Sequence, residues 1–124
     1  RNLTGGEGVN VVYDAVGAET WEGSIDCLKR RGMVVFFGAA SGPVPTFDTS
    51  ILMSKGSLVL SRASLRDFVA DGDEIAWRAD ELFDLWSTER LKIKIGQTYP
   101  LADAGTAHAD LESRRSTGKL LLRI

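Results

Sequence analysis

The sequence has 124 residues, the size of one domain, and its composition of 44% hydrophobic, 26% charged and 8% aromatic residues excludes a disordered or collagen-like chain. A formal net charge of -2 argues against a general positive field, so we expect neither nucleic acid nor a membrane surface as a partner. One cysteine cannot form an internal disulfide, and no apolar run approaches the roughly 18 residues of a membrane helix. We therefore expect a soluble, cytoplasmic protein.

The chain begins with Arg-Asn-Leu-Thr-Gly-Gly, a pattern typical of the end of a helix, although no helix precedes it. We therefore expect the sequence to begin in the middle of a fold, so that residues that define an activity would lie upstream of it.

The first half alternates between apolar runs and segments with helical spacing. The predicted elements, in chain order, are a strand over 9–15, a helix over 19–31 that ends in a basic run before Gly32, a strand over 33–37, a short helix over 48–53 and a strand over 57–61. This order is typical of an α/β fold with a parallel sheet and crossover helices.

The second half has more amphipathic character. Asp71 and Glu74 have the spacing of a capping box at the start of a long helix. The other predicted elements are a short helix around 65–69, a long helix with Ile75, Ala79, Leu82 and Trp86 on its apolar face, a strand over 91–95 that Pro100 terminates, a helix over 102–115 and a closing strand over 120–124.

Candidate binding residues follow the three predicted strands of the first half. Open parallel sheets bind ligands at the carboxyl ends of their strands, which places residues 14–17, 37–42 and 62–64 along one edge. Gly38 either lets a ligand approach the backbone or only turns the chain. Arg62 either faces a phosphate group or is an ordinary solvated arginine.

Other polar and reactive residues have simpler interpretations. The glycine cluster at 4–8 precedes a strand, which is the wrong context for a phosphate-binding fingerprint and predicts a turn. Asp14 is expected to accept hydrogen bonds from the following turn and helix. We expect His108 and Cys27 to be buried, and Trp77 and Trp86 to be core or partner-contact residues, so no catalytic residue and no metal ligand is assigned.

Several strings, in order and spacing, resemble the zinc-independent quinone oxidoreductases, the zeta-crystallin-like branch of the medium-chain dehydrogenase/reductase superfamily. They cover essentially the whole chain: LTGGEGVNVVYDAVG at 3–17, WEGSIDCLKRRG at 21–32, FGAASGPV at 37–44, KGSL at 55–58, YPLADA at 99–104 with His108, and LESR at 111–114 through Thr117 and Gly118.

The resemblance implies that residues 1–124 are a partial cofactor-binding domain from the C-terminal portion of a protein more than twice as long. Residues 1–62 would form the second half of a doubly wound Rossmann-type sheet, and residues 63–124 the helices and strands that return to the catalytic domain. The implied activity is a homodimeric, metal-free transfer of hydride from NADPH to a quinone. The implied cofactor contacts are Ala15, Phe36, Phe37, Gly38, Ala39, Arg62, Ala63, Ser64 and Arg114.

Three positions depart from the family: Ala15 stands where relatives often carry Ser, Ala39 where they often carry Asn, and Ala63 where they often carry Pro. Backbone contacts would replace side-chain contacts to the cofactor at the first two. The uncharged strand over 57–61, at the edge of the sheet, is the expected dimer contact. Two alternatives stay open: a zinc-free reductase of enals or acyl thioesters, and a non-enzymatic structural or RNA-binding protein. The acidic balance argues against RNA binding.

Overall fold

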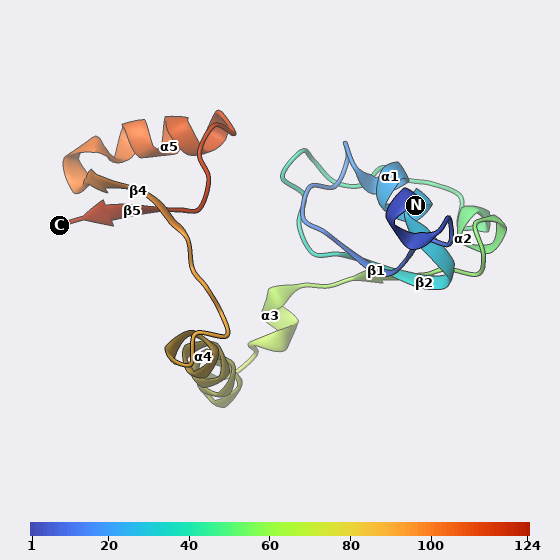
Figure 1. Ribbon diagram of the computed structural model, residues 1–124, viewed down its shortest axis with the longest axis horizontal. Helices are drawn as coiled ribbons and strands as arrows, with labels where there is room; N and C mark the ends of the chain where they lie inside the picture. Colours follow the sequence, from blue (N-terminus) through green and yellow to red (C-terminus); the bar gives the residue numbers. More distant parts are fainter. The chain divides into compact units, whose positions relative to one another are not determined.

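The computed structural model describes residues 1–124 as two compact units, Arg1–Ala70 and Asp71–Ile124 (Figure 1). No helix in the structure is both long and apolar enough to span a membrane. Each unit has its own sheet, so each is described by itself.

The first unit contains a three-stranded sheet in the order β1-β2-β3, with both pairs of strands parallel. A short 3-10 helix, η1 (Asn2–Thr4), precedes the sheet, and the elements that follow are β1 (Val9–Asp14), α1 (Trp21–Asp26), β2 (Leu28–Phe36), α2 (Ser50–Ser54), β3 (Val59–Arg62) and α3 (Leu65–Phe68). The predicted α/β class is confirmed, as are the turn at the glycine cluster and the edge position of the third strand. Parallel strands need crossover connections, which explains why helices separate them.

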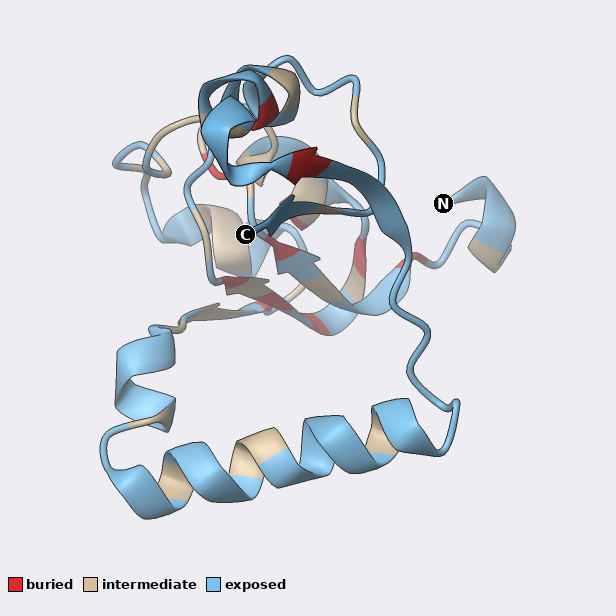
Figure 2. Ribbon diagram, turned by 90° about the vertical axis from the view of Figure 1, so that its left-hand side faces the viewer, coloured by how far each residue is buried: buried red, intermediate tan, exposed pale blue.

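The core of the first unit lies between the sheet and its helices. The buried apolar residues are Ile25, Leu28, Val34, Phe36 and Leu58, and Figure 2 colours them red. Trp21 packs against this cluster, and its ring stacks on Phe47 with centroids 5.1 Å apart. Full burial of each large apolar side chain stabilises the fold by roughly 1.5–3 kcal/mol, so this cluster holds the crossover connections on the sheet.

The helix predicted over 19–31 is wrong in its second half. Helix α1 ends at Asp26, and β2 already begins at Leu28, which pairs with Val9. The register then shifts so that Val11 pairs with Met33, and Arg31 within this irregular part has a φ of 62°. The basic residues therefore belong to a strand, and long-range pairing overrides the local pattern of a helix end. Cys27, predicted to be buried, caps α1 and is exposed.

The second unit consists of the helix α4 (Gly72–Ser87), a parallel pair of strands, β4 (Ile95–Pro100) and β5 (Lys119–Arg123), and between these strands the 3-10 helix η2 (Leu101–Asp103) and α5 (Ala104–Glu112). Asp71 caps α4 as predicted, because its side chain accepts a hydrogen bond from the Glu74 N–H at 2.9 Å. No residue of α4 is buried, which Figure 2 shows as a helix without red segments. Ile75, Leu82 and Trp86 of its predicted apolar face are therefore exposed.

The strand predicted over 91–95 is displaced, because β4 begins only at Ile95. The ladder with β5 begins at Ile95, and only the last of the preceding alternating residues takes part in it, since the Lys94 carbonyl accepts a hydrogen bond from the Lys119 N–H at 2.8 Å. The predicted helix over 102–115 is shorter, since α5 ends at Glu112. Tyr99 is buried and donates a hydrogen bond from its hydroxyl to Asp110 at 2.7 Å, which ties β4 to α5.

The first prediction concerns the core of the first unit. Replacing Leu28, which is 1% exposed, by Ala should lower the free energy of unfolding by about 2–4 kcal/mol, because it removes buried contacts and leaves a cavity. Urea denaturation measures this change. Leu65→Ala is the matched control, because Leu65 is 75% exposed, and its effect should stay within about 0.5 kcal/mol. Equal effects of the two substitutions would contradict the position of Leu28 in the core.

Candidate binding edge of the parallel sheet

The carboxyl ends of the three parallel strands lie level with one another. Asp14 of β1 pairs with Phe36 of β2, and Phe36 pairs with Arg62 of β3. The residues after each strand therefore form one edge. We call this set the carboxyl edge; it consists of Ala15, Phe37, Gly38, Ala39, Arg62, Ala63 and Ser64, together with the backbone of Phe36.

Backbone hydrogen bonds join the three segments of the carboxyl edge directly. The Phe37 N–H donates to the Asp14 carbonyl at 3.0 Å, and the Ala40 N–H donates to the Ala15 carbonyl at 3.2 Å. On the other side, the Ala63 N–H donates to the Phe36 carbonyl at 3.2 Å. The sheet argument from the sequence is thus confirmed in its geometry: the three predicted segments are neighbours.

Gly38 is required by packing. A Cβ atom at this position would lie 2.4 Å from the Ala15 carbonyl oxygen and 2.9 Å from the Ala15 Cα. Both are backbone atoms, which cannot move aside as the end of a flexible side chain can. Close packing of the chain against Ala15 is therefore a third role for Gly38, beside the two considered from the sequence.

Arg62 is held in place by an uncharged acceptor. One Nη1–H of its guanidinium donates to the Phe36 carbonyl at 2.8 Å, and the side chain is exposed. The Phe36 side chain is only 1% exposed and belongs to the core, so this residue contributes to the carboxyl edge through its backbone. The guanidinium has further N–H donors, which leaves it able to bind an anionic group.

Asp14 is the buried polar group beneath this edge, at 5% exposure. Its carboxylate accepts hydrogen bonds from the N–H groups of Val16 at 2.8 Å and Gly17 at 3.0 Å, as the sequence predicted. It also accepts from the hydroxyls of Thr20 at 2.8 Å and Ser24 at 2.6 Å. Burial by itself raises the pKa of Asp14, but these four donors outweigh it and lower the pKa to about 2.

The roles of Thr20 and Ser24 were missed at the level of sequence. The signal is present, because hydroxyl residues four positions apart lie on the same face of a helix. Their face turns towards the end of β1 only when α1 packs on the sheet. Ser41 is a further unpredicted contact, since its hydroxyl donates to the Val16 carbonyl at 2.8 Å and accepts from the Glu19 N–H at 3.0 Å.

The remaining candidates belong to the second unit. Arg114 follows α5 and has a φ of 57°. His108 was predicted to be buried, but it is exposed, because the buried position of α5 is the preceding residue, Ala107. In this structure no group of three or more His, Cys, Asp or Glu residues is arranged to hold a metal ion.

The second prediction tests the Asp14 carboxylate. Because its pKa in the fold is about 2, below the ordinary 3.8, the ionised form stabilises the fold above pH 4, and this stabilisation is lost as the pH falls from about 4 to 2. Asp14→Asn should therefore lower the free energy of unfolding by about 2 kcal/mol at pH 7, and the difference from the parent should shrink below pH 4. Urea denaturation at several pH values measures this. The exposed Asp67→Asn is the control, and a pH-independent effect of Asp14→Asn would contradict the assignment.

Comparisons with known proteins identify the family to which this chain is similar. The model of the zinc-binding dehydrogenase family matches residues 1–122. The quinone oxidoreductase of Salmonella typhimurium is 46% identical over 124 residues, which are 98% of this chain and 38% of that protein. The chain thus spans about two fifths of the length of the curated relatives it matches.

Solved structures give the same result. A mycobacterial protein complexed with NADPH is 49% identical with a TM-score of 0.91, over 100% of this chain and 38% of that one. The Escherichia coli quinone oxidoreductase complexed with NADPH is 45% identical with a TM-score of 0.89, over 99% of this chain and 38% of that one. The Rossmann-type fold and the resemblance to quinone oxidoreductases are therefore confirmed, and the chain belongs to the zinc-binding dehydrogenase family.

Proposed function

We propose that this chain is the cofactor-side part of an NADPH-dependent quinone oxidoreductase. The observation that carries the proposal is the carboxyl edge, where three strand ends meet and where the topology of a parallel α/β sheet favours ligand binding. Identities of 45–49% to proteins with NADPH-bound structures support the choice of cofactor. The similarity to quinone oxidoreductases favours a quinone as the substrate over the enals and acyl thioesters of the alternative hypothesis.

The residues of the carboxyl edge fit a flat, anionic cofactor. Ala15 and Ala39 are exposed and small, so the backbone at both strand ends is open to a ligand. Phe37 is 53% exposed and offers an aromatic ring. Arg62 offers a fixed positive charge. We propose that Ala15, Phe37, Gly38, Ala39, Ala63 and Ser64 contact the cofactor, with Phe36 acting through its backbone and Arg62 and Arg114 through their charges.

In this proposal the chain binds and orients, and NADPH when bound supplies the hydride that reduces the quinone. The carboxyl edge would fix the position of the cofactor through the packing of Gly38 against Ala15. The Asp14 network would hold the loop after β1 in place beneath it. Metal-free chemistry and a cytoplasmic location are also part of the proposal, and both rest on the resemblance to the zinc-independent branch.

The third prediction concerns the activity, which is tested with the intact protein. NADPH consumption followed at 340 nm should depend on an added quinone and should exceed the rate with an enal of similar size. Residues 1–124 alone should show no turnover, because they span only 38% of the length of the active relatives. A faster rate with the enal would support the alternative reductase. No NADPH consumption with either substrate class would contradict the proposal.

The fourth prediction concerns Arg114 in the intact protein. Arg114→Asn should weaken NADPH binding about tenfold, the effect of losing one charge-assisted contact of about 1.4 kcal/mol. Asn is chosen because the φ of 57° suits it better than Ala. Arg90→Asn, which removes an exposed charge from the same unit, is the control. Calorimetry measures both affinities, and an unchanged affinity for Arg114→Asn would remove Arg114 from the site.

We further propose a homodimer that forms through the segment 57–61, most of which is β3. This segment carries no charge, lies at the sheet edge and exposes 48% of Val59. An exposed, uncharged edge strand pairs readily with another strand, and the same strand of a second copy would cover both edges.

The fifth prediction tests this dimer by sedimentation. Val59→Pro restricts the backbone and removes one N–H donor, so it should shift the protein towards monomer. Val59→Lys places a charge on the exposed side chain and should have the same effect while leaving the backbone unchanged. Met53→Lys, at an exposed position on α2, is the control. A monomeric parent, or a dimer undiminished in both Val59 variants, would contradict this interface.

A further inference from the structure

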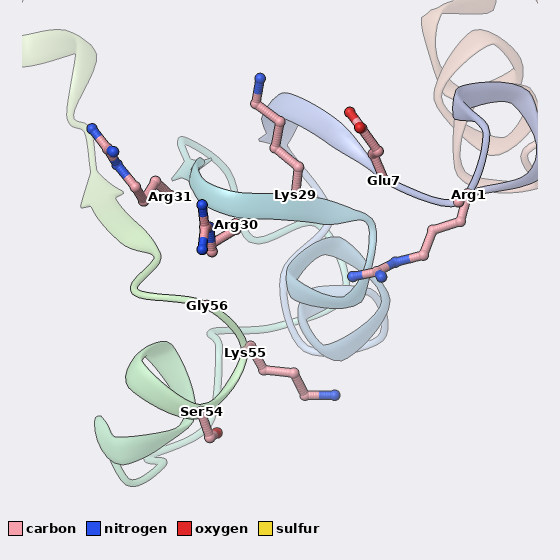
Figure 3. Close-up of a pocket in the computed structure, with 9 residues that line it drawn as sticks. Arg1, Glu7, Lys29, Arg30, Arg31, Ser54, Lys55 and Gly56 are labelled. Atoms are coloured by element: carbon pink, nitrogen blue, oxygen red, sulfur yellow. The ribbon is translucent and has the colours of Figure 1, made fainter.

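A pocket of the first unit lies at the amino ends of the strands, opposite the carboxyl edge. Its volume is about 840 Å³. Figure 3 shows that three segments surround it: Arg1, Gly6 and Glu7 before β1, Lys29, Arg30 and Arg31 at the start of β2, and Ser54, Lys55 and Gly56 before β3. None of these residues belongs to the proposed cofactor site.

The wall of this pocket is strongly positive, although the whole chain is slightly acidic. Five basic side chains line it, against the single carboxylate of Glu7. Lys55 is neutralised by Asp26, whose Oδ1 lies 2.6 Å from its Nζ. The side chains of Lys29, Arg30 and Arg31 have no ion-pair partner in the structure, so three uncompensated charges come from one short stretch of β2.

The wall is held in place before any ligand binds. The Arg1 guanidinium donates from Nε to the Asp26 carbonyl at 2.9 Å and from Nη2 to the Leu28 carbonyl at 3.0 Å. The Arg31 N–H donates to the Gly56 carbonyl at 2.8 Å. A Cβ on Gly56 would lie 3.1 Å from the Arg30 Cα, and its φ of 116° also favours glycine. The loop before β3 therefore packs directly on the basic stretch.

The lining residues and the volume of this pocket indicate which class of ligand it could bind. No large apolar side chain lines the pocket, which argues against a lipid or an aromatic ligand. Its volume lies within the range of about 300–1,000 Å³ that is usual for small-molecule sites. Several basic side chains around one pocket favour an anion with more than one negative group, and guanidinium groups match phosphate oxygens in geometry. We propose that this pocket binds a small molecule through two adjacent phosphate groups.

The test uses the intact protein, with inorganic pyrophosphate as the probe and saturating NADPH present to occupy the carboxyl edge. Calorimetry should detect pyrophosphate binding that is stronger than orthophosphate binding and that weakens as salt is added. ADP in a parallel titration distinguishes the two sources of this chemistry. Tighter binding of ADP than of pyrophosphate identifies a nucleotide, and equal or weaker binding identifies the free diphosphate; both results support the proposal.

The variants locate the binding site. Lys29→Gln with Arg30→Gln should weaken pyrophosphate binding at least about tenfold, the effect of losing one contact of about 1.4 kcal/mol. Arg66→Gln removes a charge from α3, outside the pocket, and should leave the affinity unchanged. Thermal unfolding of each variant checks that it is folded, and Arg30→Gln alone serves if the double variant is not. A Kd of the parent above about 1 mM, or equal affinities in parent and pocket variants, would overturn the proposal.

Discussion

The Asp14 carboxylate is the interaction on which the first unit depends. It lies where β1 ends and the crossover to α1 begins, and it is almost fully buried. A buried charge without partners would destabilise the fold, but here two backbone N–H groups and two hydroxyls compensate it. Its hydroxyl partners, Thr20 and Ser24, fix the start of α1 over the strand. The loop that contributes Ala15 to the carboxyl edge therefore has a defined position.

The sequence predicted the elements whose burial dictates their composition. The buried positions of β2, such as Val34 and Phe36, must be apolar, which is why residues 33–37 stand out as an apolar run, whereas the apolar β1 residues Val11 and Tyr13 are exposed. Parallel pairing then places the carboxyl ends of the strands together, so the location of the candidate site followed from topology alone. The cap at Asp71 was equally predictable, because a helix N-terminus offers donors that a neighbouring side chain must accept.

Features that depend on distant partners could not be predicted in this way. The start of β2 at Leu28 is set by pairing with Val9, which lies far away along the chain, while the local residues favour a helix end. The exposure of His108 and Cys27 depends on which faces of the short helices pack inward. The basic pocket could not be predicted for the same reason. In the sequence, Lys29, Arg30 and Arg31 have the pattern of a helix C-terminus, and only the fold brings them to the same pocket as Arg1 and Lys55.

The two kinds of anchor used by the basic side chains differ in their response to the solvent. Lys55 is held by the exposed carboxylate of Asp26, so dissolved ions compete for both partners. Arg62 is held by the Phe36 carbonyl, which has no net charge and does not titrate. The Arg62 guanidinium is consequently fixed without a counterion, and its orientation should persist as the ionic strength rises. An anionic ligand that binds Arg62 therefore does not have to displace a carboxylate of the protein from the guanidinium.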